Sequence, residues 1–473
     1  MTSTDRLRTA AVGVLLSLLV AAPALAVPAP RSPAASEALA REIFAEIIGT
    51  NTTHAIGSAK AADALAARFL AGGFPAADVY VGGPRPDKMN IVVRLRGKGK
   101  GKPVLFNAHL DVVEAIRETW SLDPFVLTEK DGFFYGRGTV DVKNEVAILT
   151  ANLIRLKKEG YTPDRDIILF FNTDEETGGD ANGADWMLKE HRPLIEAGLV
   201  INHDAGKGQA LHGEKLWNTI QTAEKVYATY SLTTAGAGGH SSLPPRDNAI
   251  ARLARALAKL DAYQFPVRFS DTTRQYLEAA SGRVGAETGA AARALLANPA
   301  DVAALEKLRD APVFNAQAHS TCPVTLVQGG QSESALPMRA KATIQCRLLP
   351  DENTDAVLAT LRRVIDDPAV EVGVVTEPNP SPAATLDKAV VAKVEQITSE
   401  MWPGVKVVPV MSSGASDNVF FRRAGLPTFG VSGTFVEESD LRAHGRDERV
   451  GVNEFYESLE FSYRLIRSLA AAR

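Results

Sequence analysis

Three acidic residues, Asp174, Glu175 and Glu176, begin one residue beyond the largely apolar stretch ILFFN at residues 168–172. Carboxylates this close repel one another, and a stretch typical of a buried strand leaves little water to weaken that repulsion. One explanation is a solvated loop, which is the usual place for an acidic cluster. The other is a cation at the end of the strand, which would turn the repulsion into attraction and provide metal chemistry.

Further histidines and carboxylates follow other strand-like stretches or lie in turns and loops beyond them. They are His109 and Asp111 after VLFNA, Asp141 in GRGTVDVK, Asp204 after LVINH, and His444 in RAHGRDER. Parallel strands gather ligands at their carboxyl ends, so these side chains are expected at one edge. Imidazole and carboxylate groups suit Zn²⁺, and a shared carboxylate can hold two ions about 3.5–4 Å apart. A lone His-x-Asp pair is more often a hydrogen-bonded pair in a loop. Here the order of these residues, their spacing and their positions at strand ends together favour a pair of metal ions.

The elements that must position these residues follow an α/β pattern between residues 90 and 204. The stretches IVVRLRG, VLFNAH, DIILFFN and LVIN are typical of strands. Between them, EVAILTANLIRLKKEG has apolar residues at helical spacing and ends at Gly160. Strands that alternate with helices predict a layer of largely parallel strands.

From about residue 221 the pattern changes to longer strands and two amphipathic helices in the order β-α-β-β-α-β, which predicts a two-layer sandwich. Residues 265–318 are Ala-rich and helical in pattern, and we interpret them as an insertion. The α/β pattern resumes after Pro378. The sequence thus predicts one α/β domain in two parts, 37–220 and 378–473, interrupted by a smaller α+β domain at 221–377.

The first 26 residues have the features of an export signal. Arg6 and Arg8 precede the apolar run TAAVGVLLSLLVAA, and small residues at 24–26 offer a cleavage site. A membrane anchor is the alternative, but the run is shorter than the roughly 20 residues a spanning helix needs. We expect cleavage after Ala26, a disordered mature start at 27–36, and a secreted or periplasmic protein with no membrane attachment.

Composition is that of an ordinary globular protein: 473 residues, 45% hydrophobic and 23% charged, enough for two or three domains. The formal net charge of −4, with both signs mixed, gives no basis for a nucleic-acid partner. Cys322 and Cys346 flank VQGGQSESALPMR, and a hairpin there would bring them together. An oxidising compartment permits a disulfide, although two buried thiols fit the sequence as well.

Six motifs resemble, in order, the motif series of metallopeptidase family 20. They are HLDVV at 109–113, GRGTVDVK at 136–143, TDEETGG at 173–179, GGHSSLP at 238–244, RLLP at 347–350 and AHGRDER at 443–449. The family includes glutamate carboxypeptidase, aminoacylase, carnosinase and succinyl-diaminopimelate desuccinylase. The resemblance runs from about residue 40 to the C-terminus. It implies a zinc-exopeptidase-like, three-layer catalytic domain interrupted by a lid and dimerisation domain.

The resemblance also implies a role for each residue of the metal centre. Asp141 would bridge two Zn²⁺ ions, for which Co²⁺ or Mn²⁺ can substitute. The remaining protein ligands would be His109 and Asp204 for one ion, and Glu176 and His444 for the other. In this family a cis peptide bond tends to follow the bridging aspartate, here between Asp141 and Val142.

Two further residues would serve the chemistry. The resemblance makes Glu175 the general base that takes a proton from the bridging water and returns it to the leaving nitrogen. It makes Asp111 the acceptor of a hydrogen bond from the His109 ring, which fixes the imidazole tautomer.

Substrate-binding roles follow the resemblance too. His240 would reach the site from a partner subunit, Arg347 would clamp a substrate carboxylate, and Gly414 would lie in the turn SSGASD that cradles that carboxylate. From the residues alone, His240 could be a turn residue, and Arg347 fits a surface strand position better. Ser334 departs from the family, which usually has asparagine there, so fine specificity is the part least defined.

We therefore expect an exported dizinc hydrolase that releases a C-terminal amino acid from a small peptide, as a carboxypeptidase or dipeptidase, and that forms a homodimer through its lid. The alternative is an N-acyl-amino-acid amidohydrolase with the same chemistry. A solute-binding protein would also have an export signal and two domains, but it has no need of Glu175.

Overall fold

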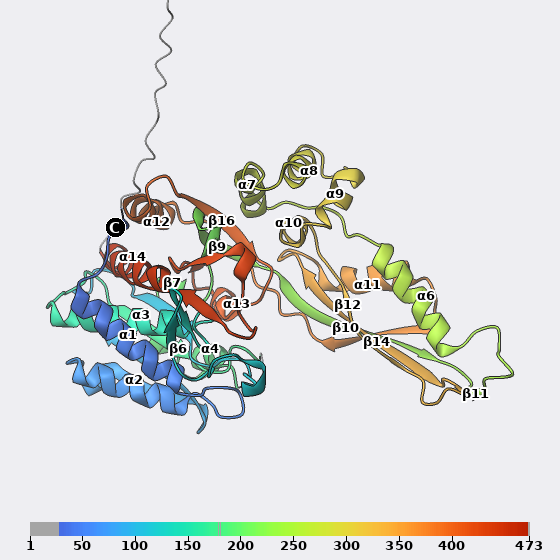
Figure 1. The fold of residues 1–473 in the computed structure, drawn as a ribbon, viewed down its shortest axis with the longest axis horizontal. Helices are drawn as coiled ribbons and strands as arrows, with labels where there is room; N and C mark the ends of the chain where they lie inside the picture. Colours follow the sequence, from blue (N-terminus) through green and yellow to red (C-terminus); the bar gives the residue numbers. More distant parts are fainter. Residues whose placement is uncertain (1–27, 178, 180, 472–473) are drawn as a thin grey trace, which may run out of the picture.

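The computed structural model describes residues 28–177, 179 and 181–471. Two bodies make up this part of the chain: a wide α/β domain and a narrower domain that extends from it (Figure 1). The predicted signal peptide and its cleavage site lie outside the described residues. Within the described part, no helix combines the length and apolar character needed to cross a membrane.

The wide domain is built on one ten-stranded sheet, in which β16 pairs with β9 and the other strands follow the order β1-β2-β6-β3-β7-β17-β9-β8-β18. The bounds are β1 Val79–Arg85, β2 Lys88–Leu95, β3 Val104–His109, β6 Ile167–Asn172, β7 Leu199–Asn202, β8 Gly208–Leu211, β9 Glu214–Glu224, β16 Lys406–Ser412, β17 Thr428–Gly430 and β18 Phe435–Glu437. Strands β6, β3, β7 and β17 are parallel, so their carboxyl ends share one edge.

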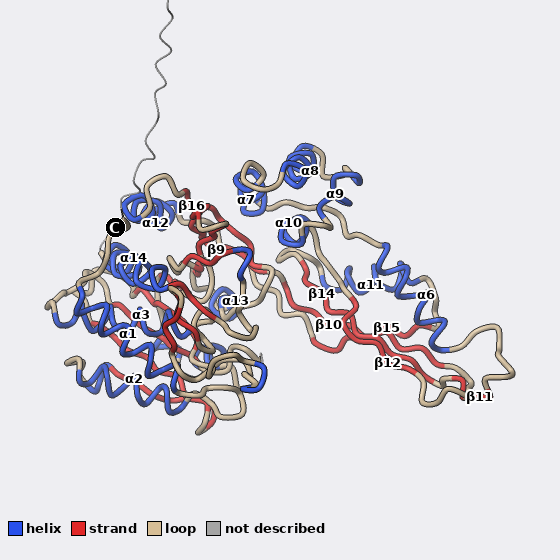
Figure 2. The backbone as a smooth tube through the Cα atoms, in the orientation of Figure 1, coloured by secondary structure: helices blue, strands red, loops and turns tan. Residues whose placement is uncertain are grey.

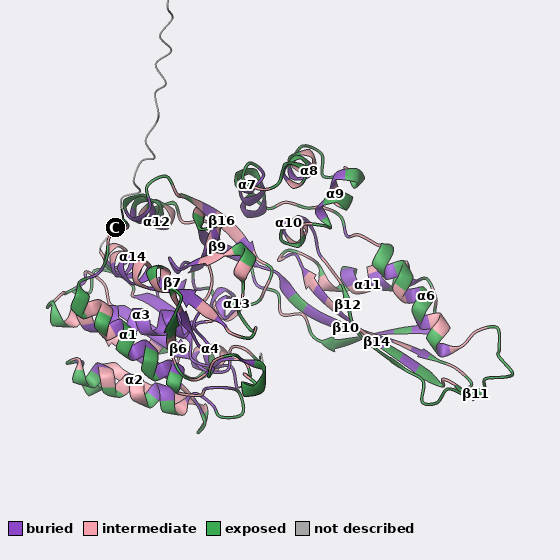
Figure 3. Ribbon diagram, in the orientation of Figure 1, coloured by how far each residue is buried: buried purple, intermediate pink, exposed green. Residues whose placement is uncertain are grey.

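Helices cover both faces of this sheet, so its central strands are buried on both sides (Figures 1 and 3). In β3, Phe106 packs into the core under one helical layer and Leu105 into the core under the other, as the strand period of two requires. One layer holds α1 Ala34–Gly49, α2 Ala59–Ala71, α3 Lys143–Lys158, α12 Lys388–Met401 and α14 Val452–Ala470; the other holds α4 Gly183–Glu190, α5 Arg192–Ile195 and α13 Asn418–Arg423. The predicted three-layer α/β domain is confirmed.

A small three-stranded sheet lies beside the main one. It consists of β4 Thr128–Lys130, β5 Phe133–Tyr135 and β19 Arg449–Gly451. Because β19 follows the loop that carries His444, its antiparallel pairing with β5 fixes where that loop ends.

Residues 28–33 lie along the wide domain, which differs from the disordered start predicted for 27–36. Ser32 is only 5% exposed, and its hydroxyl donates to Glu460 at 2.9 Å. Arg31 pairs with Glu37 and lies over the ring of Tyr456. The Ser32–Glu460 contact spans 428 positions in sequence, so local composition could not reveal it.

The narrower domain has a four-stranded antiparallel sheet in the order β12-β14-β10-β15, with β10 Val226–Ala235, β12 Val324–Gly329, β14 Arg339–Leu348 and β15 Val370–Thr376. Helices α6 Ala249–Ala262 and α11 Thr354–Ile365 pack on one face of it. A short pair, β11 Gly239–His240 and β13 Ala335–Leu336, lies at its far tip (Figures 1 and 2). This is the two-layer sandwich expected from the sequence; we call it the lid.

The helical insertion lies within the lid sequence but packs on the wide domain. Its helices are α7 Asp271–Ala280, α8 Ala286–Ala297, α9 Val302–Leu308 and α10 Pro312–Ala318. Tyr276 and Leu277 share a hydrophobic cluster with Trp217 of β9 and Val408 of β16. The insertion therefore covers the wide domain's sheet near the point where the lid begins.

Lys225, between β9 and β10, marks the junction of the two domains, close to the predicted boundary at 221. Its side chain is 1% exposed, and Nζ donates to the backbone oxygen of His319 at 2.6 Å. The junction is thus tied to the end of the insertion. Burial, together with the charge of Arg347, lowers the pKa of Lys225 to about 7.

This lysine should make stability depend on pH. Between about pH 7 and 10 it is neutral in the folded chain and charged in the unfolded one, so the unfolded state binds more protons and the free energy of unfolding rises with pH. The free energy of unfolding rises by about 1.4 kcal/mol for each pH unit in this window. Below pH 7 the lysine is charged in both states, and the full cost of burying that charge remains. Denaturant titrations of wild type and Lys225→Met should diverge across this window; parallel curves would contradict the shifted pKa.

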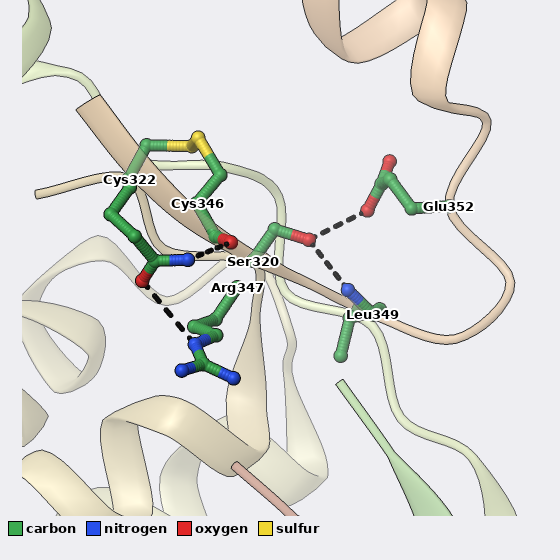
Figure 4. Close-up of a disulfide and its surroundings, with 7 residues drawn as sticks. Ser320, Cys322, Cys346, Arg347, Leu349 and Glu352 are labelled. Atoms are coloured by element: carbon green, nitrogen blue, oxygen red, sulfur yellow. Dashed lines mark hydrogen bonds between the residues drawn. A yellow bond between two sulfur atoms is a disulfide. The ribbon is translucent and has the colours of Figure 1, made fainter. Parts of the chain in front are cut away.

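Cys322 and Cys346 form a disulfide, so the first of the two alternatives left open by the sequence is realised (Figure 4). It joins the segment that leaves the insertion to β14. Beside it, Arg347 and Thr321 exchange both backbone hydrogen bonds, at 2.8 and 3.0 Å. Ser320 caps the same region by donating to Glu352 and accepting from the backbone of Leu349.

Candidate metal centre

His109 is the last residue of β3, and its ring is fixed from both sides. Nδ1 donates to the backbone oxygen of Asp111 at 2.9 Å, because a carbonyl can only accept. Nε2 therefore faces the site, 3.3 Å from Oδ1 of Asp141 and 3.9 Å from Oδ1 of Asp204. The ring is 1% exposed, so water does not compete for this nitrogen.

Asp111 accepts the predicted hydrogen bond from the His109 ring, but through its backbone oxygen and not through its carboxylate. The nearer carboxylate oxygen lies 3.8 Å from His109 Nδ1, too far for a hydrogen bond. The carboxylate accepts instead from the backbone N–H groups of Glu175 at 3.1 Å and Glu176 at 3.0 Å. Asp111 thus sets the His109 tautomer through its backbone oxygen, and its carboxylate holds the turn that carries the two glutamates.

Five predicted ligands converge on one point, at the carboxyl edge of the sheet. Two groups have ligand atoms within 4.8 Å of one another: His109, Asp141 and Asp204 form one, and Asp141, Glu176 and His444 form the other. His444 Nε2 lies 3.1 Å from Asp141 Oδ2 and 2.9 Å from Glu176 Oε2. Asp141 belongs to both groups, as a bridging ligand must. The peptide bond between Asp141 and Val142 is cis, as expected.

Asp174, the first acid of the triplet, faces away from these groups. Its Oδ1 accepts from Nζ of Lys88 and contacts Nδ1 of His54, both at 2.7 Å. Lys88 is fully buried, so this pair neutralises Asp174 inside the protein. Neither His54 nor Lys88 follows a predicted strand, so the sequence indicated no role for them. The acidic triplet is thus divided between an ion pair, which holds Asp174, and the metal groups, which include Glu176.

Glu448 positions the loop that carries Asp141. It is fully buried; Oε1 accepts from the backbone N–H groups of Val140 at 2.8 Å and Asp141 at 3.1 Å, and Oε2 pairs with Arg137 at 2.6 Å. Glu448 lies four residues after His444 in AHGRDER. The motif thus fixes the predicted bridging aspartate through Glu448 and contributes a predicted ligand, His444.

The electrostatics match a site built for positive charge. Burial raises the pKa of Glu175 well above its usual range, and the charges of Asp204, Asp417 and Glu176 add to the effect. Hydrogen bonds to Asp141 and Glu176 raise the pKa of His444 to about 10. The raised pKa of His444 thus reflects acceptors that would hold a bound cation in place of its proton.

The residues present fit a pair of divalent cations. Two imidazoles and three carboxylates are the donors that Zn²⁺ and similar ions take, and one carboxylate is shared. In addition, Oε1 of Glu176 is buried and has no hydrogen-bond partner. His203, beside Asp204, bonds Glu145 at 3.0 Å through Nδ1 and belongs to neither group.

The predicted substrate residues lie elsewhere. His240 is exposed on β11 at the far tip of the lid and contacts Ser242 at 2.7 Å (Figure 1). Arg347 projects from β14 on the face opposite the lid helices and donates to the side chain of Gln345 (Figure 4). Its guanidinium lies over Tyr227, 4.8 Å from the ring centroid. The structure does not bring either residue to the metal groups of its own chain.

The turn at 412–417 differs in detail from its predicted role. The N–H of Gly414 donates to Oγ of Ser412 at 3.1 Å, so this donor already has a partner. Asp417 ends the turn, and its carboxylate accepts from the side chains of Asn172 and Asn182. Burial raises the pKa of Asp417 to about 7. Asp417 thereby joins this turn to the end of β6, just before Asp174.

The fold is a three-layer α/β domain interrupted by a two-layer lid, and its two candidate metal groups share one aspartate. These features together are typical of metal-dependent hydrolases with a dinuclear centre. The family model "Peptidase family M20/M25/M40" matches residues 105–468. The chain belongs to this family and is a hydrolase.

Individual proteins agree with this assignment. The chain is 28% identical over 378 residues to probable carboxypeptidase S-like 2 of Dictyostelium discoideum, covering 78% of this chain and 72% of that one. It is 28% identical over 379 residues to the N-fatty-acyl-amino acid synthase/hydrolase PM20D1 of Homo sapiens, covering 78% and 74%. Its fold matches an M20 family metallo-carboxypeptidase from Sulfolobus solfataricus with a TM-score of 0.69 at 18% identity, covering 91% and 99%.

Proposed function

We propose that this chain is an exported hydrolase that holds two Zn²⁺ ions and cleaves the amide bond before a C-terminal amino acid. The observation that supports it most is the pair of ligand groups sharing Asp141 directly beside Glu175. When bound, the cations would polarise the amide carbonyl and lower the pKa of a water held between them. Co²⁺ or Mn²⁺ would serve in the same ligand set.

Glu175 acts as the general base in this proposal. It follows Asp174, which is fixed by Lys88, and it precedes the ligand Glu176; Asp111 holds its backbone N–H. These contacts fix the backbone of Glu175 beside the predicted ligand Glu176. Burial disfavours its charged form, which suits a carboxylate that accepts a proton from water and passes it to the leaving nitrogen.

The lid supplies the remaining substrate contacts, and we propose that it does so in a homodimer. His240 lies on β11, at the end of the lid that points away from the wide domain (Figure 1), so a partner's site is the one it could reach. The edge strand β12 is exposed along its whole length, with Leu326 58% and Val327 62% exposed, which suits a surface covered by a second copy. Arg347 would clamp the substrate carboxylate by paired hydrogen bonds, beside the turn that contains Gly414.

Complementation between inactive subunits tests the dimer. Mixed dimers of His240→Ala and Glu175→Gln chains contain one site with both an intact base and an intact partner histidine. They are expected to recover up to about half the activity of a wild-type dimer, measured after co-expression with two affinity tags. Purified mixed dimers that stay as inactive as either parent would rule out action across subunits.

A second candidate is an N-acyl-amino-acid amidohydrolase, and the relative named as an N-fatty-acyl-amino acid hydrolase favours it. A substrate panel separates the two. Metal-reconstituted protein is given dipeptides and N-acyl derivatives of the same C-terminal amino acids, and kcat/KM is compared. If the enzyme is a peptidase, kcat/KM should be higher for the dipeptides. If kcat/KM is at least about tenfold higher for the N-acyl amino acids, the enzyme is an amidohydrolase of the second kind. No hydrolysis of either would reject the proposed function.

Export remains a proposal, supported by the N-terminal residues described above. Expression of the full chain in a bacterium with fractionation should give a mature protein beginning at Val27 in the periplasm or medium. An intact N-terminus in the cytoplasmic fraction would contradict it.

A further inference from the structure

Lys207 is a cation in direct contact with one of the predicted metal ligands. Its Nζ donates to the backbone oxygen of Asp204 at 2.8 Å and lies 3.6 Å from Oδ1 of the same residue. That carboxylate oxygen also lies 3.9 Å from Nε2 of His109. The place where His109 and Asp204 would hold an ion therefore has a positive charge beside it.

The loop between β7 and β8 fixes the backbone that carries Lys207. The hydroxyl of Thr219 donates to the backbone oxygen of Lys207 at 2.9 Å. Gly206 has a φ of +77°, and a Cβ atom there would lie 2.1 Å from the backbone oxygen of Gly430, so this turn requires glycine. The lysine side chain is 21% exposed, and its position beside Asp204 follows from the fold.

No other acidic side chain in the described part of the chain lies within ion-pair distance of Lys207, so Asp204 is its ionic partner. A half-buried lysine is usually paired with a carboxylate, but here that carboxylate is also a predicted metal ligand. An ion bound by Asp204 would share the carboxylate with the ammonium and be repelled by it.

The two predicted metal positions differ in this respect, although each consists of two carboxylates and one imidazole. We call His109, Asp141 and Asp204 the first position, and Asp141, Glu176 and His444 the second position. Among the described residues, no lysine or arginine is paired with Asp141 or Glu176, whose ion-pair partners are all histidines. Lys207 thus offsets one carboxylate charge at the first position only.

We propose that Lys207 makes the first position the weaker and exchangeable one, so that the protein keeps one ion at the second position and takes up the other as the free metal concentration rises. A ligand oxygen lies about 2 Å from Zn²⁺, so an ion on Oδ1 of Asp204 would lie at most about 6 Å from the ammonium. At that distance a unit charge changes the affinity for a divalent cation by at least about tenfold. This inference rests on the two-ion site of the proposed function, but not on the substrate.

Removal of the charge should strengthen zinc binding. In Lys207→Met, the dissociation constant of the more weakly bound ion should fall at least about tenfold, measured by competition with a zinc chelator of known affinity. Lys207→Gln is neutral but can still donate to a backbone oxygen, and it should shift the constant in the same direction. A lysine that only held the loop would, once removed, weaken zinc binding instead, so the direction of the change separates the two roles.

A conservative variant and a matched lysine serve as controls. Lys207→Arg keeps the charge, and a cavity of about 580 Å³ beside Lys207 leaves room for the larger guanidinium. Its zinc affinities should stay within about threefold of wild type. Lys215 is 20% exposed and pairs with Glu457 at 3.2 Å, outside both metal positions. Lys215→Met should leave both affinities within about twofold of wild type, because its charge has its own partner.

Anomalous diffraction at limiting zinc identifies the weaker position. Wild-type crystals with one equivalent of Zn²⁺ per chain should give a stronger peak beside Glu176 and His444 than beside Asp204. In Lys207→Met the difference should shrink or reverse. A stronger wild-type peak beside Asp204, or zinc affinities that Lys207→Met and Lys207→Gln leave unchanged or weaken, would overturn the proposal.

These measurements also separate this inference from the proposed function. Two bound ions with the expected shift in Lys207→Met, but no hydrolysis of any amide, would support the role of Lys207 and reject the proposed activity. Amide hydrolysis by a two-ion protein whose zinc affinities do not depend on Lys207 would reject this inference alone. Protein that binds no zinc at either position would reject both.

Discussion

Glu175→Gln is expected to lower kcat by about 10³-fold while both metal ions stay bound, because a general base contributes roughly 10²–10⁴-fold to such reactions. The glutamine keeps the shape of the side chain, and the backbone N–H of residue 175 still reaches Asp111. The amide cannot accept a proton from water. Single-turnover kinetics and metal analysis of the same preparation measure the two effects separately.

Glu190→Gln is a suitable control, since Glu190 is exposed at the end of α4. It should match wild type in rate and metal content. If Glu175→Gln retained more than about a tenth of the wild-type kcat, or if its metal content fell, the assignment of Glu175 as the base would be wrong.

Asp141→Asn should have the largest effect on metal binding. Loss of a second-sphere partner typically costs 10–100-fold in metal affinity, and Asp141 is a predicted ligand to both ions, so at least about 100-fold at each position is expected. The amide lacks the negative charge that offsets two cations. Equilibrium dialysis against buffered Zn²⁺ measures the affinities, and activity should fall below detection at low micromolar zinc.

Asp63→Asn, at an exposed position on α2, provides the comparison for a lost carboxylate outside the centre. It should bind zinc as wild type does. Two tightly bound ions per chain in Asp141→Asn would be incompatible with a shared ligand at this position.

The candidate site was predictable because it depends on the ends of strands. His109, Asp204 and the Glu175–Glu176 pair each follow a run of apolar residues, and parallel strands bring such positions to one edge. The role of each residue came from the resemblance, and Asp141 and His444 in addition lie in loops whose path the local sequence does not define. The structure brings them within hydrogen-bond distance of each other.

The contacts that support the site were harder to predict, because they join distant positions. Lys88 reaches Asp174 across 86 residues, and Glu448 reaches Val140 across 308. The carboxylate of Asp111 turned out to hold backbone N–H groups rather than the His109 ring, a choice that depends on a few ångströms of loop geometry. The insertion's position on the wide domain was hidden for a similar reason: an amphipathic helix shows that one face is buried, but not against what.

The most direct test of the central claim is anomalous X-ray diffraction at the zinc edge from crystals of the metal-reconstituted protein. Two peaks are expected about 3.5–4 Å apart, on either side of Asp141, one beside His109 and Asp204 and the other beside Glu176 and His444. A single peak, or zinc bound away from these five side chains, would contradict a dinuclear centre and with it the proposed chemistry.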